Sequence, residues 1–109
     1  MDIEQLRHYC INKPGSEESF PFGNDTLVFK LHNKLFLLAS LDVQPLRFNV
    51  KCDPEKAVAL RENYPKSVLP GYHMNKKHWN TIIIDGLISS KQLCEFIDES
   101  YELVSKKKK

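Results

Sequence analysis

The segment Pro70–Thr81, P-G-Y-H-M-N-K-K-H-W-N-T, concentrates side chains that can bind or react. It contains two histidines, two lysines, two asparagines, a tyrosine and the only tryptophan of the chain. Connections within a compact domain are usually short and plain, so this density of donors, positive charges and flat aromatic faces indicates a binding site. The alternative is structural: Trp79 and Tyr72 close one end of a sheet, and Lys76 and Lys77 only solvate a turn.

A metal site is the enzymatic hypothesis that this segment suggests, with His73 and His78 as ligands and His32 as a third. The spacing of five residues between His73 and His78 is not the i, i+4 spacing of a helical pair, and no convincing third ligand stands out. One histidine that holds the loop by hydrogen bonds, with a second exposed beside the lysines, is the simpler explanation. We therefore expect neither a metal nor a cofactor.

Other routes to catalysis lack their sequence signatures. Cys10, Cys52 and Cys94 are widely spaced without a C-x-x-C pair, which indicates neither a disulfide framework nor a zinc site. No neighbouring residue marks one of these cysteines as an activated nucleophile. The few glycines are scattered, so there is no nucleophile elbow or phosphate loop. We expect a protein without catalytic residues.

A second candidate surface comes from a strand with strict alternation that begins at Arg47. Successive side chains of a strand point to opposite faces, so Phe48, Val50 and Cys52 would face the core. Arg47, Asn49 and Lys51 would then align on the other face. The alternation predicts a polar, basic sheet face, and Lys76 and Lys77 are expected to continue it.

The elements that position these residues follow from apolar periodicity and from turn and capping signals. In chain order we expect a helix over Asp2–Lys13, a loop over Ser16–Asp25, strands over Thr26–Leu31, Leu35–Leu41 and Arg47–Cys52, a helix capped by Asp53 and stopped by Pro65, a strand over Trp79–Ile84 with room for another in Lys66–His78, and a helix over Ser90–Lys106 capped by Ser89. This order predicts an α+β fold with helices on a mainly antiparallel sheet.

Length and composition are those of one modest domain, because 109 residues with 41% hydrophobic content leave no room for a second core. We assign the domain to residues 1–105 and interpret the last four residues, all lysine, as a frayed basic tail. No apolar run approaches the roughly 18 residues of a membrane span, and the start M-D-I-E-Q-L lacks the features of a secretory signal. A cytoplasmic protein is the expectation.

The net charge of +2 hides an uneven distribution. Residues 26–82 carry nine Lys or Arg against four Asp or Glu, whereas residues 83–105 carry one against five. Such a pattern can place a positive face opposite a negative one in a small domain. It favours a polyanion as partner.

Three blocks of the sequence together resemble the MmcQ/YjbR family of small bacterial proteins. They are P-F-G-N-D-T-L-V-F-K at Pro21–Lys30, N-V-K-C-D-P-E at Asn49–Glu55, and the segment Pro70–Thr81. The resemblance implies a two-layer fold like that of secretion chaperones, with about five strands in the order helix, three strands, helix, two strands, helix. The family is described as DNA-binding through two strand-built wings, and it brings no catalytic residues.

Charge distribution and resemblance together predict a non-enzymatic DNA-binding protein of low sequence specificity, in which cations contact phosphates. The candidate nucleic-acid-binding residues are Lys30, Lys34, Arg47, Lys51, Tyr72, His73, Asn75, Lys76, Lys77 and His78. Trp79, at the head of a strand, is interpreted as an anchor of the fold rather than a reader of bases. The alternative is a protein-interaction module, which the chaperone-like fold and the acidic last helix favour. In either case we expect a monomer.

Overall fold

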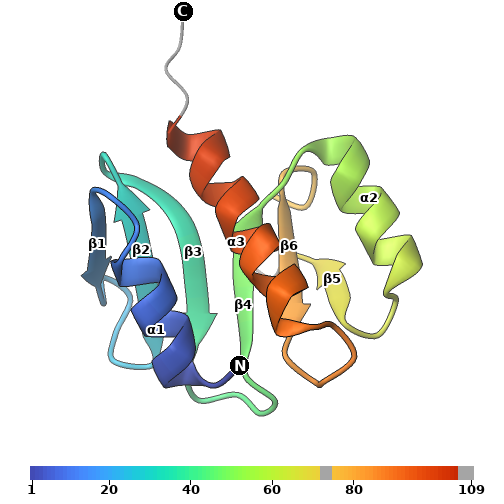
Figure 1. Ribbon diagram of the computed structural model, residues 1–109, viewed down its shortest axis with the longest axis horizontal. Coiled ribbons are helices and arrows are strands. Elements are labelled where there is room, and N and C mark those ends of the chain that lie inside the picture. The colour runs from blue at the N-terminus through green and yellow to red at the C-terminus, as the bar shows by residue number, and fades with distance from the viewer. Residues whose placement is uncertain (72–74, 106–109) are drawn as a thin grey trace, which may run out of the picture.

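The structure, a computed structural model, describes residues 1–71 and 75–105. These residues form three helices and one antiparallel sheet with the spatial strand order β1-β2-β3-β4-β6-β5 (Figure 1). The elements are α1 (Ile3–Ile11), β1 (Ser16–Ser19), β2 (Thr26–Leu31), β3 (Lys34–Ser40), β4 (Arg47–Lys51), α2 (Pro54–Asn63), β5 (Val68–Pro70), β6 (Trp79–Ile83) and α3 (Ser90–Ser105). The predicted site residues Tyr72 and His73 and the terminal lysines lie outside the described residues.

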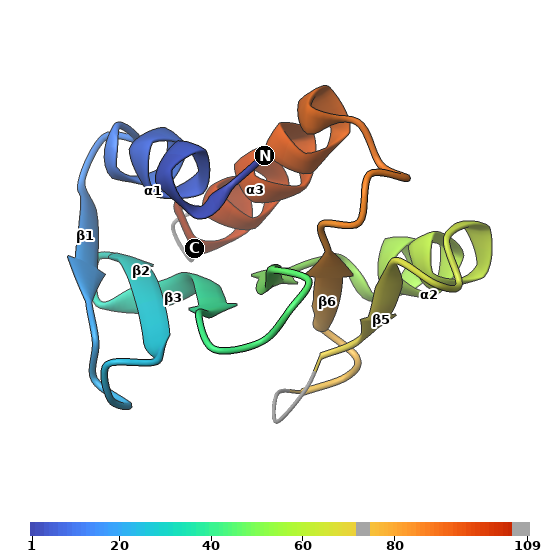
Figure 2. The same cartoon turned by 90° about the horizontal axis from the view of Figure 1, so that it is seen from below.

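The helices and the sheet form two layers, as predicted for an α+β fold. Helices α1 and α3 lie together on one face of the sheet, and α2 packs against β5 and β6 (Figure 2). Phe29, Phe36 and Phe48 of the sheet are fully buried beneath this helical layer. The Phe36 ring packs edge-on against Tyr101 of α3, with 5.4 Å between the ring centroids. The core therefore lies between the sheet and α1 and α3.

A β-bulge in β3 shapes one end of this core. Phe29 pairs with Leu37, but the next residue of β2, Lys30, pairs with Leu35. Phe36 is the extra residue, and the bulge turns its side chain to the same face as Leu37. Both side chains therefore enter the core, where strict alternation would have sent them to opposite faces.

Ser100 of α3 satisfies the backbone at this end of the sheet. Its hydroxyl donates to the carbonyl oxygen of Phe36 at 2.6 Å and accepts from the amide of Lys51 at 2.8 Å. Ser100 is fully buried, so both bonds are shielded from water. The contact fixes α3 over β3 and β4.

Side-chain hydrogen bonds cap the starts of α1 and α3, and the cap by Ser89 was predicted. Asp2 and Gln5 form a reciprocal capping box at α1, with both bonds at 2.9 Å. At α3, the hydroxyl of Ser89 accepts from the amide of Gln92 at 3.1 Å. None of the helices within residues 1–71 and 75–105 combines the length and apolar character needed to cross a membrane.

The predicted cap of α2 is wrong in its mechanism. The side chain of Asp53 makes no capping hydrogen bond, although its carbonyl oxygen accepts from the amide of Ala57 at 2.8 Å. Pro54 in the first turn has its φ preset for a helix, so α2 can begin without a side-chain acceptor.

Strand β1 was not predicted, and the sheet has six strands rather than about five. Its sequence, S-E-E-S, lies in the segment that was expected to be a loop and lacks the apolar alternation of a strand. The strand lies at the sheet edge, and its Glu18 faces α1 through a 2.7 Å ion pair with Arg7. The contact between β1 and α1 is therefore ionic, whereas the sequence patterns that predict strands depend on buried apolar side chains.

Candidate nucleic-acid interface

The sheet face turned away from α1 and α3, which we call the open face, carries no helix from the described part of the chain (Figure 2). A row of paired residues crosses this face over all six strands: Ser19, Val28, Leu38, Asn49, Thr81 and Leu69. The row contains three polar and three apolar residues, and Val28 among them is fully buried. The open face is therefore a mixed surface rather than a second apolar core.

Three cationic side chains flank this row, and all were predicted site residues. Lys30, Arg47 and Lys51 are half-buried and face the open side by strand register. No residue of the described chain forms an ion pair with any of the three. Glu17, which pairs with Lys30 from β1, is the nearest acidic residue in register. Their charges thus remain available to an external anion.

Asn49 lies on this face as predicted, but it is not an exposed contact residue. It is only 4% exposed, and its side-chain oxygen accepts a hydrogen bond from the hydroxyl of Thr81. Thr81 is equally buried and is the cross-strand partner of Asn49. A polar pair inside a sheet loses less on burial when its members bind each other. Asn49 therefore holds β4 to β6 and does not read a ligand.

Lys34 is the predicted cation that the structure places elsewhere. It pairs with Leu31, a core residue, and so its register position belongs to the helix-covered side. The bulge at Phe36 causes this change, because one extra residue reverses the faces of every position before it in β3. Lys34 is exposed at the β2–β3 turn and is not part of the open face.

Asn75 and His78 hold the end of the β5–β6 loop. The Asn75 side-chain oxygen accepts from the amide of Lys77 at 2.8 Å, and its carbonyl oxygen accepts from the amides of His78 at 3.2 Å and Trp79 at 2.9 Å. The carbonyl oxygen of His78 accepts from the amide of Cys52 at 2.7 Å. These bonds give both residues a structural role and leave Lys77 exposed.

Arg61 of α2 anchors the same loop, although it was not among the predicted site residues. Its guanidinium donates to the carbonyl oxygen of Lys76 at 3.0 Å and to the side-chain oxygen of Asn80 at 2.9 Å. The Asn80 amide in turn donates to the carbonyl oxygen of Ala57 at 3.3 Å. An arginine on a predicted helix carries no signal of such a distant contact, so sequence patterns could not reveal it.

Lys76 and Lys77 lie in the loop before β6, outside the strands that form the open face. Together with Arg61 they line a surface groove against Pro54 and Val58 of α2. Glu55 also lines this groove. The predicted cations among the described residues thus lie in three places: on the open face, beside α2 and, for Lys34, at the β2–β3 turn.

Trp79 lies on the open face, which changes its predicted role. It is the cross-strand partner of Lys51, and the two side chains share a face because paired residues of adjacent strands do so. Its side chain is half-buried. Trp79 therefore presents part of its indole to the side away from the core instead of anchoring the core.

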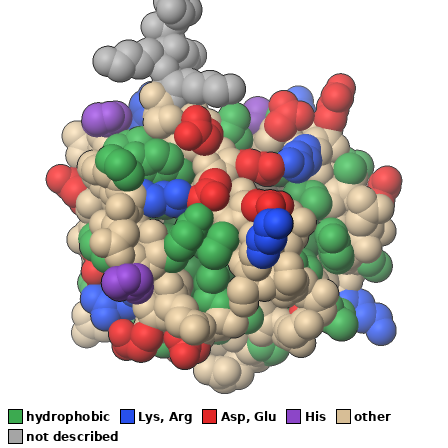
Figure 3. Space-filling model, in the orientation of Figure 1, with side chains coloured by type: hydrophobic (Ala, Val, Ile, Leu, Met, Phe, Trp, Pro, Cys, Tyr) green, Lys and Arg blue, Asp and Glu red, His purple; other side chains and the backbone are tan. Residues whose placement is uncertain are grey.

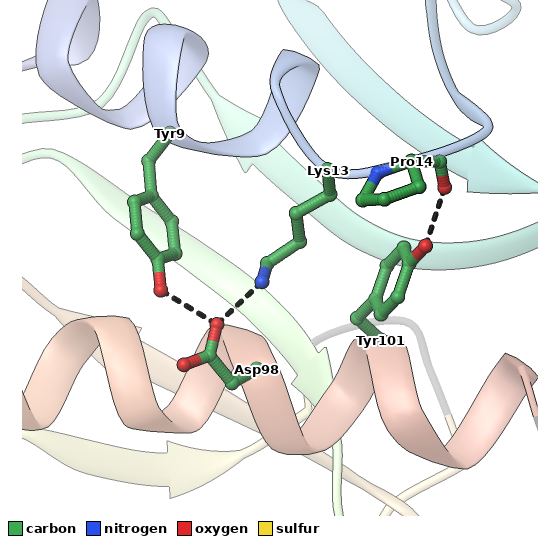
Figure 4. Close-up of polar contacts among 5 residues, drawn as sticks. All are labelled: Tyr9, Lys13, Pro14, Asp98 and Tyr101. Carbon is green, nitrogen blue, oxygen red and sulfur yellow. Dashed lines mark hydrogen bonds and ion pairs between the residues drawn. The ribbon is translucent and has the colours of Figure 1, made fainter.

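The helix-covered face has a different electrostatic character, because acidic and basic side chains are interspersed over it (Figure 3). Lys56 forms an ion pair with Glu99 of α3. At the α1–α3 contact, the Asp98 carboxylate accepts hydrogen bonds from Tyr9 at 2.6 Å and from Lys13 at 2.5 Å (Figure 4). Tyr101 donates to the carbonyl oxygen of Pro14 beside them.

These contacts shift the pKa values of Tyr9 and Asp98, which lie between α1 and α3. Burial raises the pKa of Tyr9, and its hydrogen bond to Asp98 raises it further. Burial alone would also raise the pKa of Asp98, but the hydrogen bonds from Lys13 and Tyr9 outweigh it and lower that pKa. The tyrosine stays protonated and the carboxylate charged at neutral pH, as suits a contact that holds two helices together.

Thiol and metal chemistry find little support in the described residues. Burial raises the pKa of the Cys10 thiol to about 12 and also raises the pKa values of Cys52 and Cys94, so none supplies a thiolate at neutral pH. No group of three His, Cys, Asp or Glu residues suited to a metal occurs within residues 1–71 and 75–105. His32 occupies the β2–β3 turn with φ 53°.

Comparison with known proteins identifies the family. A model of the YjbR family matches residues 11–103. The chain belongs to the YjbR family. Uncharacterised relatives include YbdF of Escherichia coli O157:H7, 38% identical over 93% of this chain and 82% of its own length. YjbR of Escherichia coli K12 is 32% identical over 94% of this chain and 86% of its own length.

Solved structures of similar sequence share the fold. The crystal structure of the Deinococcus radiodurans protein DR2400, a DUF419 domain, superposes with a TM-score of 0.91 at 42% identity, covering 96% of this chain and 79% of that one. A Pseudomonas syringae protein superposes with a TM-score of 0.77 at 25% identity, covering 94% and 98%. The YjbR fold thus holds over nearly the whole length of this chain.

The blocks that resemble the YjbR family contain much of the buried polar network described above. Asn49 begins the second block, and Asn80 and Thr81 end the third. Asn80 links β6 to α2, and Thr81 links it to β4. In these blocks the asparagines therefore support the fold, while the cations beside them remain at the surface.

Proposed function

We propose that this YjbR-family protein binds DNA with low sequence specificity and that its open face contacts the phosphates. The observation that most supports the proposal is the set Lys30, Arg47 and Lys51 on a sheet face without a helix. None of them forms an ion pair with another described residue, whereas acidic residues of α3 pair with Lys13 and Lys56 on the opposite face. A bound phosphate backbone would supply the missing counter-charges.

The arrangement favours backbone contacts over base readout. Phosphate contacts position a protein without carrying sequence information, and no helix or narrow ribbon from the described chain projects from the open face into a groove. With about three phosphate contacts we expect affinities near the 10⁻⁴ to 10⁻⁶ M of non-specific binding. The groove with Lys76 and Lys77 would form a second, weaker contact region.

A monomeric state is part of the proposal, because both edges of the sheet resist pairing with another chain. Edge strand β1 carries Glu17 and Glu18, and edge strand β5 is three residues long and ends at Pro70. Charges, short edges and proline all oppose edge-to-edge association. Sedimentation velocity should give a single monomeric species at concentrations well above those used for binding.

The test compares the salt dependence of duplex binding between the wild type and variants that each lack one cation. Lys30→Ala, Arg47→Ala and Lys51→Ala should each flatten the slope of log K against log salt by up to about 0.9, and the triple variant by up to about 2.7. Lys91→Ala is the control, because Lys91 is an exposed lysine in the first turn of α3 and should leave the slope unchanged. Fluorescence anisotropy of a labelled duplex between about 50 and 200 mM salt provides the measurement.

Two outcomes would count against the proposal. If the triple variant keeps the wild-type slope, the open face does not contact the phosphates. If the wild-type protein fails to bind even at low salt, DNA is not its partner, and the interaction-module alternative should be tested instead.

A further inference from the structure

Two aromatic groups border the cations of the open face from opposite sides. Trp79 lies on β6 beside Lys51. Phe20 and Phe22 lie in the β1–β2 loop, with exposed fractions of 44% and 68%. This loop extends to the side of the sheet away from α1 and α3 (Figure 2).

The aromatic loop is held in place by backbone hydrogen bonds. The amide of Gly23 donates to the carbonyl oxygen of Phe20 at 3.3 Å, and the amide of Thr26 donates to Gly23 at 3.3 Å. The carbonyl oxygen of Asp25 accepts from the amide of Leu41, just after β3, at 2.8 Å. A loop tied in this way presents Phe22 without a large ordering cost on binding.

A single exposed phenylalanine would need no explanation, but two beside a basic face do. Flat rings next to cations match the two recurring parts of a nucleotide chain, its bases and its phosphates. Stacking of a base on an aromatic side chain needs an unpaired base with a free face, which the interior of a duplex does not offer. From β2 to β6 the open face spans three strand spacings, roughly 14 Å, and the cations lie within this span, Lys30 on β2 and Arg47 and Lys51 on β4.

We propose that the open face prefers single-stranded nucleic acid, with Phe22 and Trp79 stacking on unpaired bases and Lys30, Arg47 and Lys51 contacting the intervening phosphates. The inference rests on the proposed function, because it assigns the same cations to phosphates. It adds a preference for the strand form that phosphate contacts alone do not create.

Trp79 supplies the probe, since it is the only tryptophan of the chain. The full chain is titrated at low salt with an oligo(dT) strand and with a duplex of the same length. Oligo(dT) should quench the Trp79 fluorescence and bind more tightly than the duplex. Phe22→Ala should weaken oligo(dT) binding by roughly 5- to 100-fold and leave duplex binding nearly unchanged.

Leu87→Ala is the matched control, because Leu87 is also 68% exposed and lies in the β6–α3 loop on the helical side. This variant should bind oligo(dT) as the wild type does. Circular dichroism should show that both variants remain folded, since neither residue belongs to the core. A loss specific to Phe22→Ala then reports a direct contact.

The outcomes separate this inference from the proposed function. Equal binding of strand and duplex without quenching, or an unaltered Phe22→Ala variant, would overturn the single-strand preference and leave phosphate binding intact. Failure to bind either form would overturn the proposed function and this inference with it.

Discussion

The two faces of the sheet differ in how their polar groups find partners. On the helix-covered face, Glu18, Asp98 and Glu99 each pair with a cation, and Ser100 bridges two strands. On the open face, Lys30, Arg47 and Lys51 form no ion pair with a described residue. Both faces belong to the same strands, so the difference arises from what covers them.

Because of this difference, we expect some residues of a single strand to serve stability and others to serve binding. In β4, Phe48 and Val50 face the helices and are almost completely buried, whereas Arg47 and Lys51 face the open side. Burial of apolar side chains dominates folding free energy, while half-exposed cations contribute little to it. We expect substitutions at neighbouring positions of β4 to affect different properties.

The largest expected effect comes from emptying the core under α3. Phe48→Ala should lower the free energy of unfolding by about 3–5 kcal/mol, because it removes a fully buried ring and leaves a cavity. Arg47→Ala and Lys51→Ala should each change it by less than about 0.5 kcal/mol. Urea unfolding followed by circular dichroism measures all three. A Lys51→Ala variant as unstable as Phe48→Ala would break the proposed separation of the two faces.

A smaller effect is expected where the open face itself contributes to stability. Asn49→Ala should cost about 1–3 kcal/mol, because it removes a buried hydrogen-bond partner of Thr81. Combined with Thr81→Val, the loss should be smaller than the sum of the two single losses by about 0.5 kcal/mol or more. Additive losses in this double-mutant cycle would mean that the pair does not act as a unit.

The smallest effect concerns pH and the α1–α3 contact. The pKa of Asp98 in the folded protein lies below the ordinary value of an aspartate, so its contribution to stability is present above that ordinary value and is lost as the pH falls through the lower, folded pKa. Wild type should therefore be more stable than Asp98→Asn at neutral pH, and the difference should shrink as the pH falls from about 5 to 2. Urea midpoints at several pH values test this, with Glu95→Gln as the exposed control on α3. A difference that stays constant with pH would contradict the assigned role of Asp98.

Much of the fold could be predicted because local chemistry and tertiary structure agree. The alternation of β4, the capping residue Ser89 and the turn after β2 all act over a few residues. Strand β1 was not predicted from the sequence. It lies at the sheet edge and contacts α1 through a salt bridge, so its sequence has no apolar alternation. Local sequence patterns therefore predict the strands and helices that bury apolar side chains, and did not predict β1, which contacts its neighbouring helix through charged side chains.

The candidate site was harder to predict because its faces depend on distant contacts. The β-bulge at Phe36 moved Lys34 off the open face. Arg61, far along α2, turned the backbone of Lys76 toward the helix. Neither event leaves a local pattern, since each depends on which residues meet after folding.

By itself, the sequence determined the family, the α+β class and the inward face of β4, because these follow from residue types and their spacing. Only the tertiary structure decided which cations share a surface and that Trp79 shares it with them. The extra residue in β3 decided the face of Lys34, and the register between β4 and β6 placed Trp79 beside Lys51. Both matter because a shift of one residue reverses the face on which a side chain lies.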